Sequence, residues 1–135
     1  MLEENKSESV YTCEKDNAIK KIIIMYRKIE SDIIMLKALN INRNTFEKRK
    51  RQKQIIDSWL YLLNEYERWI VKVHLISGLS WPLVVNEFEK KWGKEQARDE
   101  RTLKRVQAKA INKIKNNVEK NALESSIKNL FYELL

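Results

Sequence analysis

The sequence predicts an all-α fold, because it contains few turn-forming residues and its apolar residues recur at helical spacing. Its 135 residues include only two glycines and one proline, which leaves few of the tight turns that an all-β fold requires. The hydrophobic fraction of 43% is high enough to form a core, although 34% of the residues are charged. A chain of this length typically forms one domain.

The N-terminal half is predicted to contain a long amphipathic helix. Residues 1–16 are polar and largely acidic, without apolar periodicity, so we expect a flexible leader there. After it, apolar residues follow one another at spacings of three and four, which places them on one side of a helix. This stripe consists of Ile19, Ile22, Tyr26, Ile29, Ile33 and Leu36, and Ile23 and Ile34 widen it. The stripe either packs inside the domain or forms the seam of a homodimer.

A second helix is predicted after an asparagine-rich loop between Asn40 and Asn44. It opens with a basic run from Lys48 to Lys53 and continues into apolar residues at helical spacing. The basic side chains form either a solvated helix face or a contact with the DNA backbone. Residues 17–63 are therefore expected to form an N-terminal helical part that serves packing or dimerisation.

Local signals divide the rest of the chain into helices. Asn64 and Glu67 have the spacing of a capping box, so a helix is expected to begin there. Gly78 is expected to end that helix in a left-handed conformation, and Ser80 to begin the next one. Asp99 is a further N-cap. A C-terminal helix is predicted within residues 119–135, capped by Asn121 or Ser125, with apolar residues at Leu123, Ile127, Leu130, Phe131 and Leu134.

The helix predicted from Asp99 to Val118 has the features of a DNA-recognition helix. Its apolar stripe consists of Leu103, Val106, Ala110, Ile114 and Val118. At 100° per residue, the opposite face carries Arg101, Arg105, Ala108 and Asn112, with Lys104 and Lys115 on one flank and Lys109 on the other. Arginine and asparagine can each form two hydrogen bonds to a base edge, and lysines can contact phosphates. Ten basic and three acidic residues lie between Lys90 and Lys115, so most of the net charge of +8 belongs to this quarter of the chain.

Two sequence motifs of this region resemble those of a known family. The motif GLSW at residues 78–81 and the motif DERTLKRVQAKAINKI at residues 99–114 are similar to region four of sigma factors. They are more similar still to the ArpU-like regulators of late transcription in phages and prophages. The resemblance covers Glu65 to Asn117 and implies a helix-turn-helix DNA-binding unit within residues 64–118.

The resemblance also implies a role for individual residues. Trp81, Val84 and Phe88 become the core of the supporting helix, and Asp99 becomes the cap of the recognition helix. Leu103, Val106 and Ala110 become its buried face. The implied DNA contacts are Arg101, Thr102, Lys104, Arg105, Lys109 and Asn112.

The chain departs from the family by about eight extra residues within residues 89–98. Either the supporting helix extends to Trp92, or the insert forms a wing-like loop. The insert brings further candidate phosphate contacts, at Lys90, Lys91, Lys94 and Arg98, and Lys115 is another in the recognition helix.

We therefore expect a cytoplasmic, DNA-binding transcription regulator of phage or prophage late genes that binds double-stranded DNA. An enzyme is not expected, because the sequence lacks a glycine-rich phosphate loop and a cluster of nucleophile and base. One histidine and one cysteine, Cys13, offer no metal site, and no cofactor is expected. No apolar run reaches the length of a membrane span.

Two alternative functions remain open at this point. The chain is also compatible with a DNA-packaging subunit of the small terminase type, or with a helical partner of RNA polymerase or of a sigma factor. A homodimer through the 19–36 stripe or through the C-terminal helix is compatible with either role.

Overall fold

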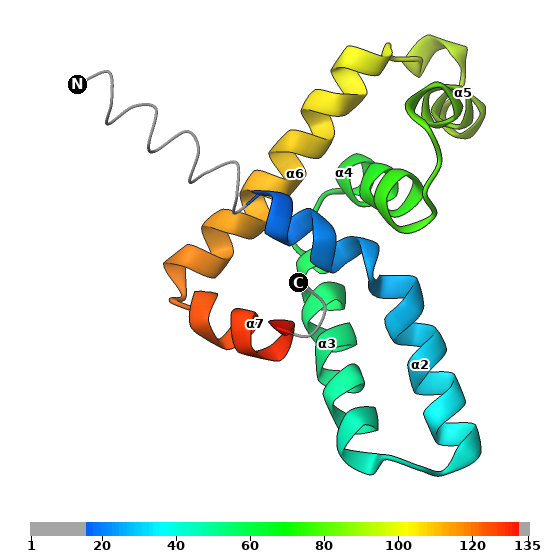
Figure 1. Cartoon of the computed structure of the whole chain (residues 1–135). Helices are drawn as coiled ribbons and strands as arrows, with labels where there is room; N and C mark the ends of the chain where they lie inside the picture. Colours follow the sequence, from blue (N-terminus) through cyan, green and yellow to red (C-terminus); the bar gives the residue numbers. More distant parts are fainter. Residues whose placement is uncertain (1–15, 133–135) are drawn as a thin grey trace.

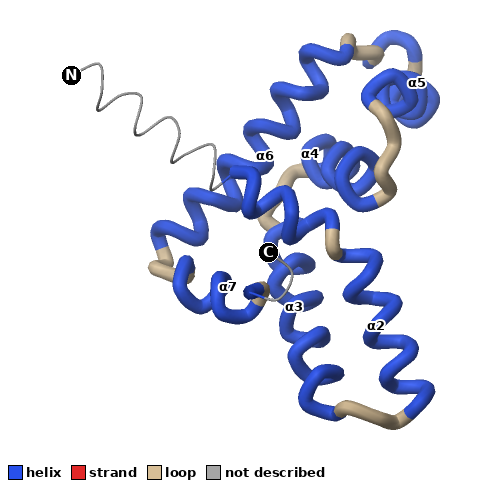
Figure 2. Tube along the Cα trace, viewed as in Figure 1, coloured by secondary structure: helices blue, strands red, loops and turns tan. Residues whose placement is uncertain are grey.

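The computed structural model describes residues 16–132, and these residues form helices joined by turns, without a strand (Figures 1 and 2). The predicted all-α class is therefore confirmed. Cys13, Leu134 and nearly all of the predicted leader lie outside the described residues. The elements are a helical segment at residues 16–24, α2 (Tyr26–Leu39), α3 (Arg43–Tyr61), α4 (Glu65–Ile70), a π-helical segment (Val71–Ile76), α5 (Trp81–Trp92), a 3₁₀ turn (Lys94–Gln96), α6 (Glu100–Lys120) and α7 (Glu124–Leu130).

Most of the predicted helix boundaries are confirmed. The capping box of α4 is complete, since Asn64 Oδ1 accepts from the Glu67 N–H and Glu67 Oε1 accepts from the Asn64 N–H, both at 2.9 Å. Gly78 has a φ of 75°, which glycine adopts without steric strain. This left-handed residue brings the Leu79 N–H to 3.2 Å from the Val73 carbonyl oxygen, so an otherwise unpaired carbonyl of the last turn is satisfied.

Two predicted boundaries are wrong. The first helix is not continuous across the 19–36 stripe, because Met25 interrupts it and α2 starts anew at Tyr26. Neither Asn121 nor Ser125 caps the last helix. Leu123 occupies the N-cap position of α7 without a side-chain hydrogen bond, and the turn is made by Ala122 at a φ of 53°.

The predicted asparagine-rich loop joins α2 to α3. Asn40 and Asn42 both adopt left-handed conformations, with φ of 53° and 50°, which asparagine tolerates better than most residues. The loop reverses the chain, so that α2 and α3 lie side by side as a hairpin at the bottom of the view (Figure 1).

The larger hydrophobic core lies between the N-terminal helices and the C-terminal end of the chain. Most of the predicted 19–36 stripe faces this core, so its apolar side chains are buried within one chain rather than offered to a dimer partner. Ile34 differs, because 70% of its surface is exposed on the outer side of α2. The buried members of this first core are Ile19, Ile22, Ile23, Ile29, Ile56, Trp59, Leu60, Leu63, Val71, Leu75, Ala110, Ile111, Ile114, Val118, Ile127 and Phe131.

A second, smaller core joins α4, α5 and the start of α6. Its buried residues are Ile70, Val84, Phe88 and Leu103, and Trp81 packs against them. Aromatic rings close its outer edge. Trp92 meets Trp69 edge to face, with ring centroids 5.0 Å apart, and it packs against Tyr66 at 4.9 Å. Such pairs add to the stabilisation that comes from apolar burial alone.

Buried polar groups fix how the helices of the hairpin pack. Arg49, from the basic run, is not solvated: its Nε donates to Asp32 Oδ2 at 3.1 Å and its Nη1 to Gln52 Oε1 at 2.9 Å. Gln52 Nε2 in turn donates to the Leu130 carbonyl oxygen at 2.8 Å, which ties α3 to the end of α7. Tyr26 donates to Asp57 Oδ1 at 2.6 Å; burial, together with this bond to the carboxylate, raises the pKa of the phenol well above its usual value.

Phe131 and Tyr132 provide a matched test of how α7 docks. Phe131 is fully buried and stacks on Trp59 at a centroid distance of 6.4 Å, whereas Tyr132 is 75% exposed. Replacing Phe131 by alanine should lower the free energy of unfolding by about 3–5 kcal/mol, because it leaves a cavity in the first core. Tyr132→Ala should change it by less than about 0.5 kcal/mol. Urea denaturation of both variants measures the difference, and equal effects would contradict this docking.

Candidate nucleic-acid interface

The outer face of α6 carries the residues that the sequence predicted to contact DNA. Arg101, Arg105, Ala108 and Asn112 are all exposed, and the opposite side of α6 is buried in both cores. The side chains of Arg101 and Arg105 form no hydrogen bond or ion pair with any other described residue. The helix therefore presents two uncommitted guanidinium groups and one amide on a fixed surface.

Asn116 lies on the same face, one turn beyond Asn112, and is also exposed. It was not among the contacts expected from the sequence, although the same 100° periodicity identifies it. Glu119 follows at the next turn and is exposed too. Because a carboxylate repels phosphate, Glu119 marks the end of the part of α6 that is suited to an anionic partner.

The start of α6 is held by its predicted cap. Asp99 Oδ1 accepts from the Thr102 N–H at 2.8 Å. Hydrogen bonding from the Thr102 side chain and backbone, with the nearby charges of Arg101 and Arg105, lowers the pKa of the Asp99 carboxyl. The carboxylate is therefore ionised under ordinary conditions, and it satisfies one of the free N–H groups of the first turn.

The flanks of α6 are partly engaged within the chain. On one flank, Lys104 pairs with Glu100 at 3.1 Å and lies over the Trp81 ring at 6.0 Å. Lys115, on the same flank, is only 13% exposed and lies 3.6 Å from Asp16. Its side chain is thus directed toward the N-terminal helical segment. Lys115 is therefore not exposed with the other candidate phosphate contacts, contrary to the prediction from the sequence.

The other flank borders a groove beside α4. Thr102 and Lys109 line this groove together with Tyr66 and Arg98, and its volume is about 250 Å³. Lys109 is exposed, whereas Thr102 is half-buried. Of the six predicted contacts, Thr102 is therefore the least accessible from outside.

The insert before α6 takes the first of its two predicted forms. α5 extends to Trp92, and Gly93, with a φ of 92°, and a 3₁₀ turn then lead to Asp99. Lys90 and Lys91 belong to the last turn of α5, and both are exposed. Lys90 pairs with Glu87 at 3.2 Å, and Lys91 lies 5.3 Å from the Trp92 ring centroid. The first part of the insert, up to Trp92, therefore continues a helix instead of forming a wing-like loop.

The rest of the insert is a compact turn. Lys94 is exposed in the 3₁₀ turn, and no other described residue pairs with its side chain. Arg98 Nη1 donates to the carbonyl oxygens of Gln96 and Ala97 at 3.0 and 3.1 Å. Because Arg98 also remains exposed, it stabilises the turn and still faces solvent.

A polar contact that the sequence did not reveal fixes α6 against the helices before it. His74 Nδ1 lies 2.7 Å from Gln107 Oε1, and since a carbonyl oxygen only accepts, the imidazole N–H donates. The His74 ring also stacks on Trp81 at a centroid distance of 3.9 Å. Gln107 is buried on the same side of α6 as Leu103 and Ala110, so the helical period identifies it as an inward-facing polar residue.

An ion pair also holds α6 to α4. Lys113 Nζ lies 2.7 Å from Glu67 Oε1, the carboxylate oxygen that also completes the capping box. Glu67 is almost fully buried, whereas Lys113 is half exposed. Lys113, one of the cations between Lys90 and Lys115, is therefore engaged within the chain and does not belong to the outer face.

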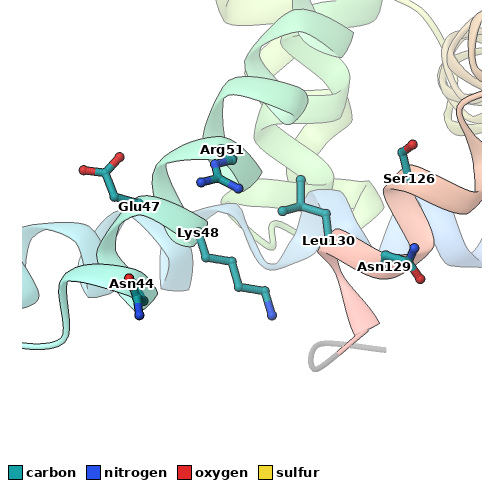
Figure 3. A pocket seen from close by; sticks show the side chains of 7 residues that line it. All are labelled: Asn44, Glu47, Lys48, Arg51, Ser126, Asn129 and Leu130. Atoms are coloured by element: carbon teal, nitrogen blue, oxygen red, sulfur yellow. The ribbon is translucent and has the colours of Figure 1, made fainter.

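A second basic depression lies between α3 and α7 (Figure 3). Its volume is about 540 Å³, and Lys48 and Arg51 border it with Ser126, Asn129 and Leu130. Glu47 points away from α7 in this view. The side chains of the basic run of α3 therefore have different surroundings. Arg49 is buried with Asp32, and Lys53 lies 3.6 Å from Asp57. Lys48 and Arg51 line the depression.

No model of a known protein family, no curated protein sequence and no solved structure matches the chain. Among the described residues, no helix has both the length and the apolar character needed to cross a membrane.

The lowered pKa of Asp99 predicts how the start of α6 depends on pH. Its cap contributes stability fully above the pKa of the unfolded chain, about 3.9, and loses it as the pH falls through the lower folded value. Asp99→Asn keeps a capping oxygen but does not titrate. Wild type should therefore lose stability relative to Asp99→Asn as the pH falls below about 4. Urea denaturation at several pH values measures this, and parallel pH profiles would contradict it.

Proposed function

We propose that the chain is a DNA-binding transcription regulator, and that the outer face of α6 reads base edges in the major groove. The observation that carries this proposal is the exposed set Arg101, Arg105, Ala108 and Asn112 on a helix whose other side is fixed in two cores. A recognition helix needs both properties, because ordering flexible groups on binding reduces affinity.

The chemistry of this face suits base recognition. The major groove, about 12 Å wide, admits an α-helix. Arg101 and Arg105 can each donate two hydrogen bonds to a guanine, and Asn112 can pair with an adenine. Ala108 is short, so it lets the helix approach the base edges closely. Arginines near the start of the helix and an amide further along would read neighbouring positions of one site.

The order and packing of the preceding elements support a helix-turn-helix unit. α4 with its π-helical extension, α5 and the first turns of α6 share the second core. In such a unit one helix supports the recognition helix from behind, and α5 occupies that position through Val84 and Phe88. The resemblance to ArpU-like regulators then suggests late genes of a phage or prophage as the target.

Phosphate contacts would come from the exposed cations around the face. Lys109 lies on the α4 side, and Lys90, Lys91, Lys94 and Arg98 extend from the end of α5 into the turn before α6. These contacts would set affinity and position without reading sequence. Lys115 would not contact DNA, because its side chain is largely covered and lies close to Asp16.

Removing the two arginines tests the proposal directly. A duplex enriched by wild-type protein from a random-sequence pool serves as the probe. Arg101→Ala with Arg105→Ala should weaken binding to it by at least about 30-fold, since a bidentate arginine–guanine pair contributes about 1–3 kcal/mol. Arg43→Ala with Arg51→Ala removes the same charge from α3 and should have a much smaller effect. Both variants should melt like wild type, because all four side chains are exposed. Equal binding by both double variants would refute α6 as the reader.

The lysines of α5 and the turn should behave differently from the arginines. Lys90→Ala, Lys91→Ala and Lys94→Ala combined should weaken binding to specific and unrelated duplexes by the same factor. The slope of log affinity against log salt is negative. Its magnitude should decrease by about 2 to 3, since each phosphate contact contributes about 0.9. Fluorescence anisotropy titrations at several salt concentrations give this slope. An unchanged slope would place the end of α5 outside the DNA contact.

A further inference from the structure

We infer that two copies of this chain associate through the outer face of α2, with the two α2 helices antiparallel. The inner face of α2 is occupied by α3, through Ile29 and the Arg49–Asp32 pair. The outer face carries Ile34, Met35 and Ala38, all exposed. None of the residues 16–132 covers them.

The residues of this outer face have the spacing of a helix–helix seam. Arg27, Ser31, Ile34 and Ala38 follow one another at intervals of four, three and four, which is the repeat that keeps one side of a helix against a partner. Small residues at Ser31 and Ala38 flank the large Ile34. An open depression of about 550 Å³, which Met35 also lines, runs along this face.

The pattern is complementary to itself when it is turned by a two-fold axis. If the axis lies level with the midpoint between Ile34 and Met35, the two copies of Ile34 meet at the centre, about 1.5 Å apart along the helix axis. Ser31 then lies opposite Ala38, so a small residue meets a small residue on both sides of the centre. Backbones can approach closely at such positions, and the two large side chains fill the middle. A two-fold interface requires this kind of self-complementary surface.

Charge fixes the direction and the register. Glu30 and Lys37 lie on the same flank of the seam, 40° and 60° from Ile34 at 100° per residue. In the antiparallel pair, the same flank of both helices meets at one edge. With the axis between Ile34 and Met35, Glu30 of one copy lies about 3 Å along the axis from Lys37 of the other. The two-fold repeats this pair, so the dimer gains two ion pairs, one at each end.

No described residue forms an ion pair or hydrogen bond with the side chain of Lys37, and the carboxylate of Glu30 acts on the nearby Tyr26 through its charge alone. Both groups are therefore available to a second copy. Apart from Ile34, this surface is distinct from the dimer seams expected from the sequence, because most of the 19–36 stripe and the apolar side of α7 face the first core.

Sedimentation velocity of the full chain over a concentration series tests the inference without DNA. Wild type should form a dimer. Ile34→Glu places two like charges at the centre of the seam and should raise the dissociation constant on the order of 100-fold. Tyr61→Glu is the matched control, because Tyr61 is 84% exposed on α3, and it should leave the dimer intact. Circular dichroism should show equal helicity for both variants.

Charge exchange tests the antiparallel register. Glu30→Lys alone and Lys37→Glu alone should each weaken the dimer roughly fivefold, because each leaves like charges facing one another twice. The double variant, Glu30→Lys with Lys37→Glu, should restore it. A monomeric wild type, a dimer unaffected by Ile34→Glu, or a double variant no better than the single ones would overturn the inference. None of these results would bear on DNA binding by α6, which the titrations measure separately.

Discussion

The structure depends on α6 remaining one unbroken helix, because its two halves belong to two different cores. Leu103, near its start, is buried with α4 and α5, whereas Ile114 and Val118 are buried with α3 and α7. Its 21 residues contain neither glycine nor proline, so nothing in its sequence favours a kink. A rigid helix of about 30 Å therefore fixes the smaller core relative to the larger one.

Two polar contacts determine the rotation of this helix about its own axis. Apolar burial alone is non-directional, and it would tolerate a modest rotation of α6. The Glu67–Lys113 pair and the His74–Gln107 hydrogen bond join successive levels of the helix to the elements before it. Because each has a short, directed geometry, together they specify which residues point outward. The proposed reading face follows from this arrangement.

The sequence predicted best those features that have a local chemical cause. The capping box at Asn64, the left-handed turn at Gly78 and the cap at Asp99 depend on neighbouring residues only, and all three are present. The outward face of α6 also followed from periodicity alone. Features that depend on distant contacts were not predictable. Lys115 is covered where it pairs with Asp16, and Arg49 where it pairs with Asp32. Both acidic partners are far away in sequence, so no local signal distinguishes these two cations from exposed ones. The break at Met25 and the start of α7 at Leu123 likewise carry no capping side chain.

The π-helical segment Val71–Ile76 has a consequence for how the chain tolerates changes in length. A π-helical turn holds one residue more than an α-helical turn, as the 2.8 Å bond from the Ser77 N–H to the Lys72 carbonyl illustrates. Loss of one residue from this segment would let it close into a regular α-helix while the capping box at Asn64 and the turn at Gly78 keep their places. If the lost residue preceded His74, a different side chain would stand at that position and the contact with Gln107 would be lost. A change of length in this segment would therefore alter how firmly α6 is held.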